Sequence, residues 1–224
     1  MFGTARHRLA ARAALLTVPL TLAGVLGATT PAQAAPTPAP TPGHGHGPGH
    51  GHQPASLTCQ GKGIDRAAKV HYRTETFVKA PPRTVWNLQT DVEAWPTWQN
   101  PAIPVTMKRL DDGPFRKYSR FQWTIPVPPG MPYPPGDVTI VSTVRQLQPG
   151  KCIRWTGPLD GPGGMHIDGV HVWNFVKVPG GVIVRTEESH TGPQVDKDVP
   201  NSTEMLGQGL EIWLKDLKTA AEKR

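Results

Sequence analysis

The sequence lacks the short motifs that mark the common catalytic and nucleotide-binding classes. It contains no Gly-x-Ser-x-Gly nucleophile elbow, no His-Glu-x-x-His zinc motif, no phosphate-cradling loop and no dinucleotide-binding glycine fingerprint. It also lacks a block of lysines and arginines, so its formal net charge of +7 is scattered along the chain. A protein that follows nucleic-acid phosphates needs such charges gathered in a patch. We therefore expect no nucleic-acid partner and no cofactor. The functions still open to this protein are acid–base catalysis and non-catalytic binding.

Long apolar runs are missing after the first 34 residues. Within that segment three arginines at positions 6, 8 and 12 precede residues 13–28, which are uncharged and mostly apolar. Ala32-Gln33-Ala34 then forms a small-x-small cleavage motif. The apolar stretch is shorter than the roughly 20 residues that span a bilayer. The sequence predicts a secretory signal peptide over residues 1–34, cleaved after Ala34, and an extracellular protein without a stable membrane span; a retained anchor is the alternative.

Cysteine is scarce, because only Cys59 and Cys152 are present and no Cys-x-x-Cys pair exists. In an exported protein both thiols would lie in an oxidising compartment, where disulfides form. One disulfide between them would close a loop of about 93 residues and stabilise the fold by roughly 4–5 kcal/mol in the chain-entropy model. We expect this bridge to fasten the N-terminal segment to a strand; two free thiols are the alternative.

Residues 35–60 consist largely of proline, glycine, alanine, threonine and histidine, with almost no apolar bulk. Such a segment cannot offset its ordering entropy, so we expect a disordered linker. His44, His46, His50 and His52 lie close together in it. Their imidazoles could bind copper, nickel or zinc weakly and in a pH-dependent way. The glycines between them leave nothing preorganised, so a plain polar tether is the alternative.

Residues rich in β-branched and aromatic side chains recur between turn signals in the middle of the chain. A strand is expected over residues 69–79, then a helix that begins at Pro81-Pro82 and a short helical segment over residues 91–99. Six more strands are expected over residues 105–110, 117–125, 137–147, 152–156, 166–178 and 182–191. Their hairpin-type turns at regular spacing predict an antiparallel meander.

The end of the chain changes to helical period. The apolar residues that share this spacing are Leu206, Leu210, Trp213, Leu214, Leu217 and Ala221. Asn201 followed by Glu204 resembles a capping box at the helix start. Gly207 and Gly209 inside this helix cost about 1 kcal/mol each relative to alanine. We therefore expect a close approach of the helix to the sheet there, or room left for another group.

A sheet with one apolar face needs a cover, and the C-terminal helix is the only long amphipathic element in the sequence. The pattern predicts an α+β protein in which a curved antiparallel sheet wraps around this helix. Five stretches support a family resemblance: residues 80–86 (APPRTVW), 91–98 (DVEAWPTW), 169–175 (GVHVWNF), 180–188 (GGVIVRTEE) and 209–218 (GLExWLKxLK).

In this order the five stretches resemble the SRPBCC superfamily, the helix-grip group that includes START domains, polyketide cyclase-like proteins and plant pathogenesis-related ligand binders. The resemblance covers about residues 66–224. It implies a helix-grip domain over residues 61–224, with two short helices after the first strand and a cavity between the concave sheet and the last helix. It does not imply one function, because this fold carries enzymes and carriers alike.

The resemblance directs attention to aromatic and polar residues that could line such a cavity. Trp123, Trp155 and Trp173 lie on three expected strands, and Trp98 lies in the short helical segment. Small-molecule sites are mostly apolar with few polar groups, so all four are candidates for ligand contact. Packing in the core is the alternative for each, because aromatic residues dominate cores as well.

Two polar candidates follow from strand period. Val182, Val184, Thr186 and Glu188 share one face of their expected strand, and His171 shares a face with Trp173 on the preceding strand. If both faces turn inward, Glu188 and His171 could orient a ligand or form an acid–base pair. Strand parity does not say which face is inward.

The Pro-rich connection over residues 126–136 is too long for a tight hairpin. Connections of this length are often functional, so we expect a lid or rim. A rigid connector is the alternative.

The function expected from these features is a secreted binding protein for a small hydrophobic or lipid-like ligand. A polyketide cyclase or aromatase-like enzyme using the same cavity is the alternative, although its carrier-bound substrates lie inside the cell. A third hypothesis is an interaction or metal-scavenging module in which the histidine tract acts and the cavity is vestigial.

Overall fold

The computed structural model describes residues 56–99, 105–127, 129 and 135–224. The predicted signal peptide and the four histidines of the linker lie outside these residues. No helix in the described part of the chain is long and apolar enough to cross a membrane.

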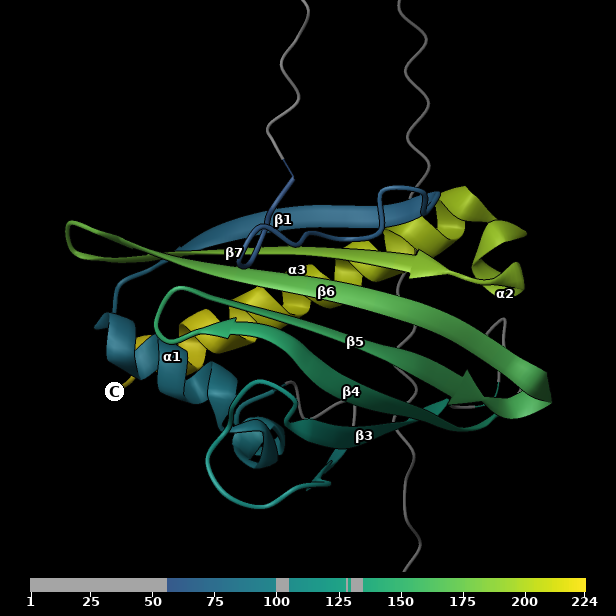
Figure 1. The fold of residues 1–224 in the computed structure, drawn as a ribbon, viewed down its shortest axis with the longest axis horizontal. Helices are drawn as coiled ribbons and strands as arrows, with labels where there is room; N and C mark the ends of the chain where they lie inside the picture. The colour runs from purple at the N-terminus through teal and green to yellow at the C-terminus, as the bar shows by residue number, and fades with distance from the viewer. Residues whose placement is uncertain (1–55, 100–104, 128, 130–134) are drawn as a thin grey trace, which may run out of the picture. The chain divides into compact units, whose positions relative to one another are not determined.

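A curved sheet of seven antiparallel strands forms one layer of the domain (Figure 1). The strands are β1 (Val70–Val78), β2 (Thr106–Arg109), β3 (Arg120–Val127), β4 (Gly136–Gln148), β5 (Cys152–Gly161), β6 (Met165–Val178) and β7 (Gly181–Thr191). Their spatial order is β1-β7-β6-β5-β4-β3-β2. Strands β2 to β7 therefore form the predicted meander, and β1 lies at one edge of the sheet, where it pairs with β7.

The second layer is α3 (Val199–Glu222), which crosses the concave face of the sheet (Figure 1). The shorter helices are α1 (Pro82–Thr90), the 3-10 helices η1 (Val92–Thr97) and η2 (Pro162–Gly164), and α2 (Pro193–Asp196). The two short helices after the first strand and the long terminal helix confirm the helix-grip fold. Helix α2 was not expected from the sequence.

The start of α3 differs from the predicted capping box. The helix begins at Val199, and the backbone N–H of Asn201 donates to Oδ1 of Asp198 at 3.2 Å. Asp198 is thus the N-cap, and Asn201 already lies in the first turn. Aspartate caps a helix as well as asparagine does, and Pro200 fits the first turn because its missing N–H is not needed there.

The face of the sheet opposite α3 carries a small separate cluster that holds the N-terminal segment. A disulfide joins Cys59 to Cys152 with a Cα–Cα distance of 5.4 Å, which confirms the predicted bridge. Leu57 and Val172 pack beside it. The Oγ of Ser56 and the backbone N–H of Leu57 donate to the carboxylate of Glu187.

This packing corrects the predicted end of the linker. The sequence placed residues 56–60 in the disordered segment, whereas Leu57 is only 5% exposed and Cys59 is fully buried. The Asn174 amide also donates to the Thr58 carbonyl at 2.9 Å. A composition-based boundary fails here because one disulfide and a few buried contacts order a segment that has few apolar residues of its own.

The two glycines of α3 have different surroundings, and both expectations for them are met. A Cβ atom at Gly207 would lie 2.7 Å from Cε2 of Tyr72 on β1, so the helix approaches the sheet closely there. A Cβ atom at Gly209 would have no neighbour within 4 Å, and Gly209 borders the cavity described below.

Alanine at these two positions is expected to change stability in opposite directions. Gly209→Ala should raise the free energy of unfolding by up to about 1 kcal/mol, because alanine favours the helix and meets open space. Gly207→Ala should lower it by about 1–3 kcal/mol, because the Tyr72 ring must move although its hydroxyl is hydrogen-bonded to Glu211. Urea unfolding measures both values. A shift of the same sign for both variants would contradict the described packing.

Candidate functional site

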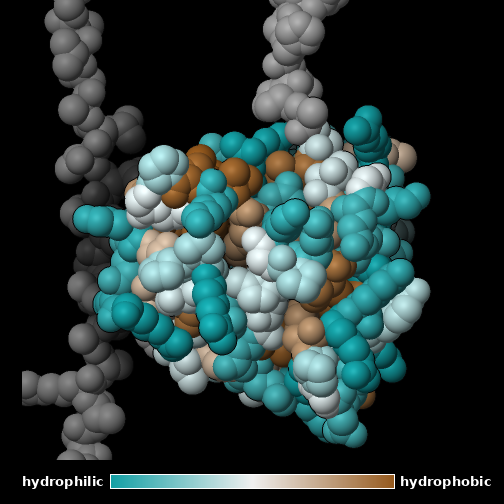
Figure 2. Space-filling view, turned by 60° about the vertical axis from the view of Figure 1, so that its left-hand side comes forward, coloured by the Kyte–Doolittle hydropathy of each residue, from teal (hydrophilic) through white to brown (hydrophobic). Residues whose placement is uncertain are grey.

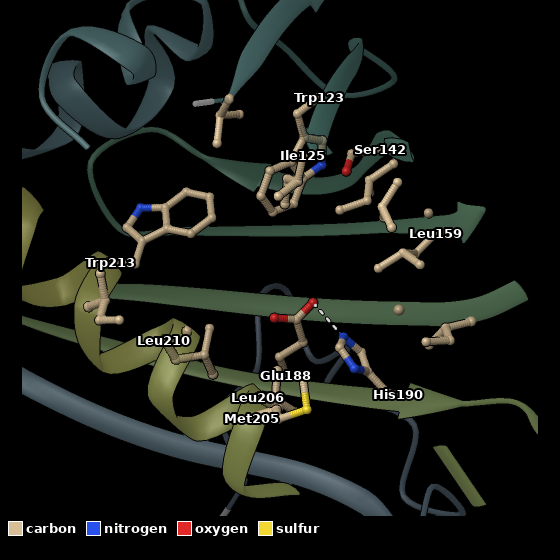
Figure 3. A pocket seen from close by; sticks show the side chains of 18 of the residues that line it. Trp123, Ile125, Ser142, Leu159, Glu188, His190, Met205, Leu206, Leu210 and Trp213 are labelled. Atoms are coloured by element: carbon tan, nitrogen blue, oxygen red, sulfur yellow. Dashed lines mark hydrogen bonds and ion pairs between the residues drawn. The ribbon is translucent and has the colours of Figure 1, made fainter. Parts of the chain in front are cut away.

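A cavity of about 620 Å³ lies between α3 and the concave face of the sheet (Figure 3). This volume is within the usual range of small-molecule sites. Its wall includes Trp123 and Ile125 from β3, Ile140 and Ser142 from β4, Trp155, Gly157 and Leu159 from β5, Ile167 and Gly169 from β6, Glu188 and His190 from β7, and Leu206, Leu210 and Trp213 from α3. Most of these side chains are apolar, and the polar ones are few.

Two glycines lie side by side in the floor of the cavity. Gly157 on β5 pairs with Gly169 on β6, and Gly169 pairs in turn with His190 on β7. The next inward-facing pair has larger side chains: Leu159, two residues after Gly157, pairs with Ile167, two residues before Gly169. A Cβ atom at Gly157 would lie 2.2 Å from the carbonyl oxygen of Val141 on β4, so the close approach of that backbone requires glycine here. Gly169 leaves only backbone at the neighbouring position of the floor.

Tryptophan rings close one end of the cavity. The ring of Trp213 on α3 lies 4.7 Å from that of Trp95 and 5.5 Å from that of Trp123, measured between centroids. The indole N–H of Trp213 donates to Oε1 of the buried Gln89 at 3.2 Å, which fixes the ring orientation. Trp155 lies 6.0 Å from Trp95 and completes this aromatic wall.

The four tryptophans singled out in the sequence divide into two groups. Trp123 and Trp155 line the cavity. Trp173 is fully buried, and Trp98 packs against the same hydrophobic core. Neither of these two lines the cavity, so packing in the core accounts for both. Strand parity correctly groups Trp173 with the inward-facing residues of β6. It does not show that this residue lies beyond the end of the cavity.

His171 and Glu188 both face inward and contact each other, as parity allowed. Nδ1 of His171 lies 3.2 Å from Oε2 of Glu188, and Nε2 lies 2.6 Å from Oγ1 of Thr186. The imidazole of His171 is only 1% exposed and packs against the rings of Trp155 and Trp173 at 4.9 and 4.8 Å. His171 thus contacts Glu188 from the buried side, while Glu188 itself borders the cavity.

His190 is a third member of this group that sequence reasoning missed. Its Nε2 lies 3.3 Å from Oε1 of Glu188, the interaction drawn in Figure 3. The signal was available, because His190 follows Glu188 by two residues on one strand and therefore shares its face. The remaining missed residues are Gly157 and Gly169, whose importance depends on strand pairing.

Burial and neighbouring charges set the protonation of the group. Burial lowers the pKa of His171 to about 4, although the Glu188 carboxylate opposes this shift. The imidazole is therefore neutral near pH 7. With that charge state we assign the Nδ1 proton to the hydrogen bond with Glu188, so that Nε2 accepts from the Thr186 hydroxyl.

Glu188 is ionised at neutral pH. Burial raises the pKa of its carboxyl group, but His171 and the hydrogen-bonding His190 outweigh burial and leave the pKa below its ordinary value. A half-buried carboxylate with two imidazole partners can accept further hydrogen bonds, hold a positive charge, or remove a proton from a molecule in the cavity.

Other predicted features lie apart from the cavity or outside the described residues. The described part of the chain contains no group of three or more His, Cys, Asp or Glu residues that could hold a metal ion. The histidine tract with His44, His46, His50 and His52 falls outside it. Most of the Pro-rich connection does too, although Pro126 at its start borders the cavity.

Comparison with known proteins is consistent with this architecture. A family model described as "Polyketide cyclase / dehydrase and lipid transport" matches residues 69–222. A search of curated proteins finds no match. Solved structures that resemble the chain are those of a Chromobacterium violaceum protein (TM-score 0.54, 18% identity, covering 68% of this chain and 96% of that one) and a START superfamily protein from Mycobacterium smegmatis (TM-score 0.51, 16% identity, covering 68% and 97%). At such identities the likeness shows the fold alone.

Proposed function

The chain belongs to the polyketide cyclase/dehydrase and lipid transport family of the SRPBCC superfamily, and from this premise we propose that it is a secreted protein that binds a small hydrophobic or lipid-like molecule. The observation that carries the proposal is the cavity of about 620 Å³ with largely apolar walls. An apolar molecule gains free energy roughly in proportion to the apolar surface that it removes from water. Such a cavity therefore favours an apolar guest over water.

The distribution of apolar side chains on the surface supports binding inside the domain. On the face that Figure 2 shows, hydrophilic side chains cover most of the surface and hydrophobic ones are visible in the gaps between them. The side chains that line the cavity from β3, β5 and α3, among them Ile125, Leu159 and Leu210, are by contrast mainly apolar.

Two features support export. The first 34 residues carry the basic region, apolar stretch and cleavage motif of a signal peptide. The Cys59–Cys152 bridge is the kind of crosslink that persists in oxidising compartments outside the cytosol.

The test is to recover the ligand from protein that has been exported and purified without denaturation. Solvent extraction followed by mass spectrometry should yield an apolar compound in near-stoichiometric amount, and an unrelated exported protein purified in parallel should not. Repeated empty extracts, with no change in tryptophan fluorescence on titration with a panel of apolar compounds, would overturn the proposal. Fluorescence is a suitable readout because Trp123, Trp155 and Trp213 line the cavity.

A cyclase-like enzyme is the second candidate, and the observation that favours it is the ionised Glu188 carboxylate at the cavity wall. A carboxylate in that position could remove a proton from a bound polyketide. The two functions differ in the fate of the ligand. A binding protein returns the compound unchanged after prolonged incubation, whereas an enzyme releases a cyclised or dehydrated product.

A further inference from the structure

We propose that the cavity selects amphiphiles whose polar head donates a hydrogen bond, a hydroxyl or an ammonium group, to the carboxylate of Glu188, and that it rejects carboxylates. This inference rests on the proposed binding function and specifies the head group of the ligand. It does not depend on the identity of the apolar part.

Glu188 has hydrogen-bonding capacity left over. A carboxylate has about four acceptor positions on its two oxygens. Within the described structure His171 uses one on Oε2 and His190 uses one on Oε1. The side chain remains 16% exposed, at a position that borders the cavity. The free acceptor positions can therefore receive donors only from a molecule inside the cavity or from water.

Residue 169, which lies beside this carboxylate in the cavity floor, is glycine and adds no side chain there. A Cβ atom at Gly169 would lie 3.6 Å from Oε1 of Glu188 and 3.7 Å from Cδ2 of His190. The backbone alone thus forms the floor at this point. A small head group can reach the carboxylate there, while the chain attached to it extends along the apolar wall.

The charges around the cavity argue against an acidic ligand. Glu188 and Asp216 are the two acidic residues among the described residues that line it, and no lysine or arginine is among them. The depressed pKa of Glu188 keeps its charge at neutral pH. A ligand carboxylate would lose its hydration beside a like charge, with no lysine or arginine in the described lining to compensate it, which is strongly unfavourable in a largely apolar site.

The experiment uses four ligands with the same ten-carbon chain: decylamine, 1-decanol, 1-methoxydecane and decanoate. Tryptophan fluorescence titration at pH 7.5 on the full mature protein measures each dissociation constant. We expect the amine and the alcohol to bind at least about tenfold more tightly than the ether, which has no donor, and than decanoate. A preference for only one of the two donors over the ether and decanoate also supports the proposal, and it assigns the head group as charged or neutral.

Glu188→Gln tests the residue itself, because glutamine keeps the size and removes the charge. In this variant the amine should lose at least about tenfold in affinity and decanoate should gain, while the ether stays unchanged. Glu75→Gln is the matched control, because it makes the same substitution at an exposed residue of β1 that does not line the cavity, and it should leave the selectivity of the wild type intact. If Glu188→Gln does not fold, Gly169→Ala replaces it, since its methyl group obstructs the approach to Oε1 while the charge remains.

The outcomes separate this inference from the proposed function. Equal affinity for all four ligands, or a preference for decanoate, would overturn the head-group assignment while leaving the binding function in place. Selectivity that survives in both Glu188→Gln and Gly169→Ala would also overturn it. Binding of none of the four ligands, together with empty extracts, would instead remove the proposed function itself.

Discussion

Replacing Leu159 by tryptophan is expected to weaken the binding of every apolar ligand by roughly a hundredfold, about 2.7 kcal/mol. Leu159 lies on β5 between Ile140 and Ile167 of the neighbouring strands, and its side chain points into the cavity (Figure 3). An indole at this position takes the volume that the ligand would occupy. Because the added bulk extends into the cavity and not into the packed core, it should cost little stability. Fluorescence titration with 1-decanol measures the affinity, and urea unfolding measures the stability.

Val176→Trp is the matched control for this substitution. Val176 lies on β6 on the opposite face of the sheet from His171 and Trp173, where it is exposed, so the same bulk is added outside the cavity. Its affinity should equal that of the wild type. Unchanged affinity in Leu159→Trp, with the fold intact, would show that ligands bind elsewhere.

Removing the Cys59–Cys152 disulfide is expected to lower the free energy of unfolding by about 4–5 kcal/mol. The crosslink joins residues 93 positions apart, and most of the expected loss arises because the reduced unfolded chain gains conformational freedom. Urea unfolding of the double variant Cys59→Ala/Cys152→Ala, compared with the oxidised wild type, measures the change. For a domain of this size that loss is a large part of the total stability.

Reduced wild-type protein is the control for this experiment, because it keeps both side chains and lacks only the bond. It should lose nearly as much stability as the double variant. Ligand affinity under folding conditions should change little, since the bridge lies on the face of the sheet opposite α3. A loss below about 1 kcal/mol would mean that the contacts of Glu187 with Ser56 and Leu57 hold the segment without the bond.

The neighbours Glu187 and Glu188 show how one strand serves both sides of the sheet. Glu187 accepts hydrogen bonds from Ser56 and Leu57 and so anchors the N-terminal segment on one face. Glu188 points to the other face, where His171 and His190 hold it at the cavity wall. Adjacent residues of a strand necessarily face opposite sides. Two acidic residues that look alike in the sequence therefore have unrelated roles.

Local patterns were sufficient to predict the seven strands, the longer helices and the crosslink, but not α2 or η2. Strand-forming runs between turn residues predicted the meander, and the apolar period of residues 206–221 predicted α3. Elimination among only two cysteines predicted the bridge between Cys59 and Cys152. The two errors have different causes. A neighbouring residue, Asp198, replaced Asn201 as the helix cap, whereas long-range contacts ordered residues 56–60 within the predicted linker.

The sequence by itself determined which residues share a face, such as Val184 with Glu188, because the side-chain period of a strand is two. Only the tertiary structure decided which face α3 covers and which rows of side chains meet there. Those rows depend on pairing between distant strands, including a shift of register between Val144 and Gln146 in β4. Gly157 and Gly169 lie side by side in the cavity floor only because that pairing brings β5 and β6 together in this register, away from the row that contains Trp173. The cavity is thus a property of strand register, which no local pattern in the chain encodes.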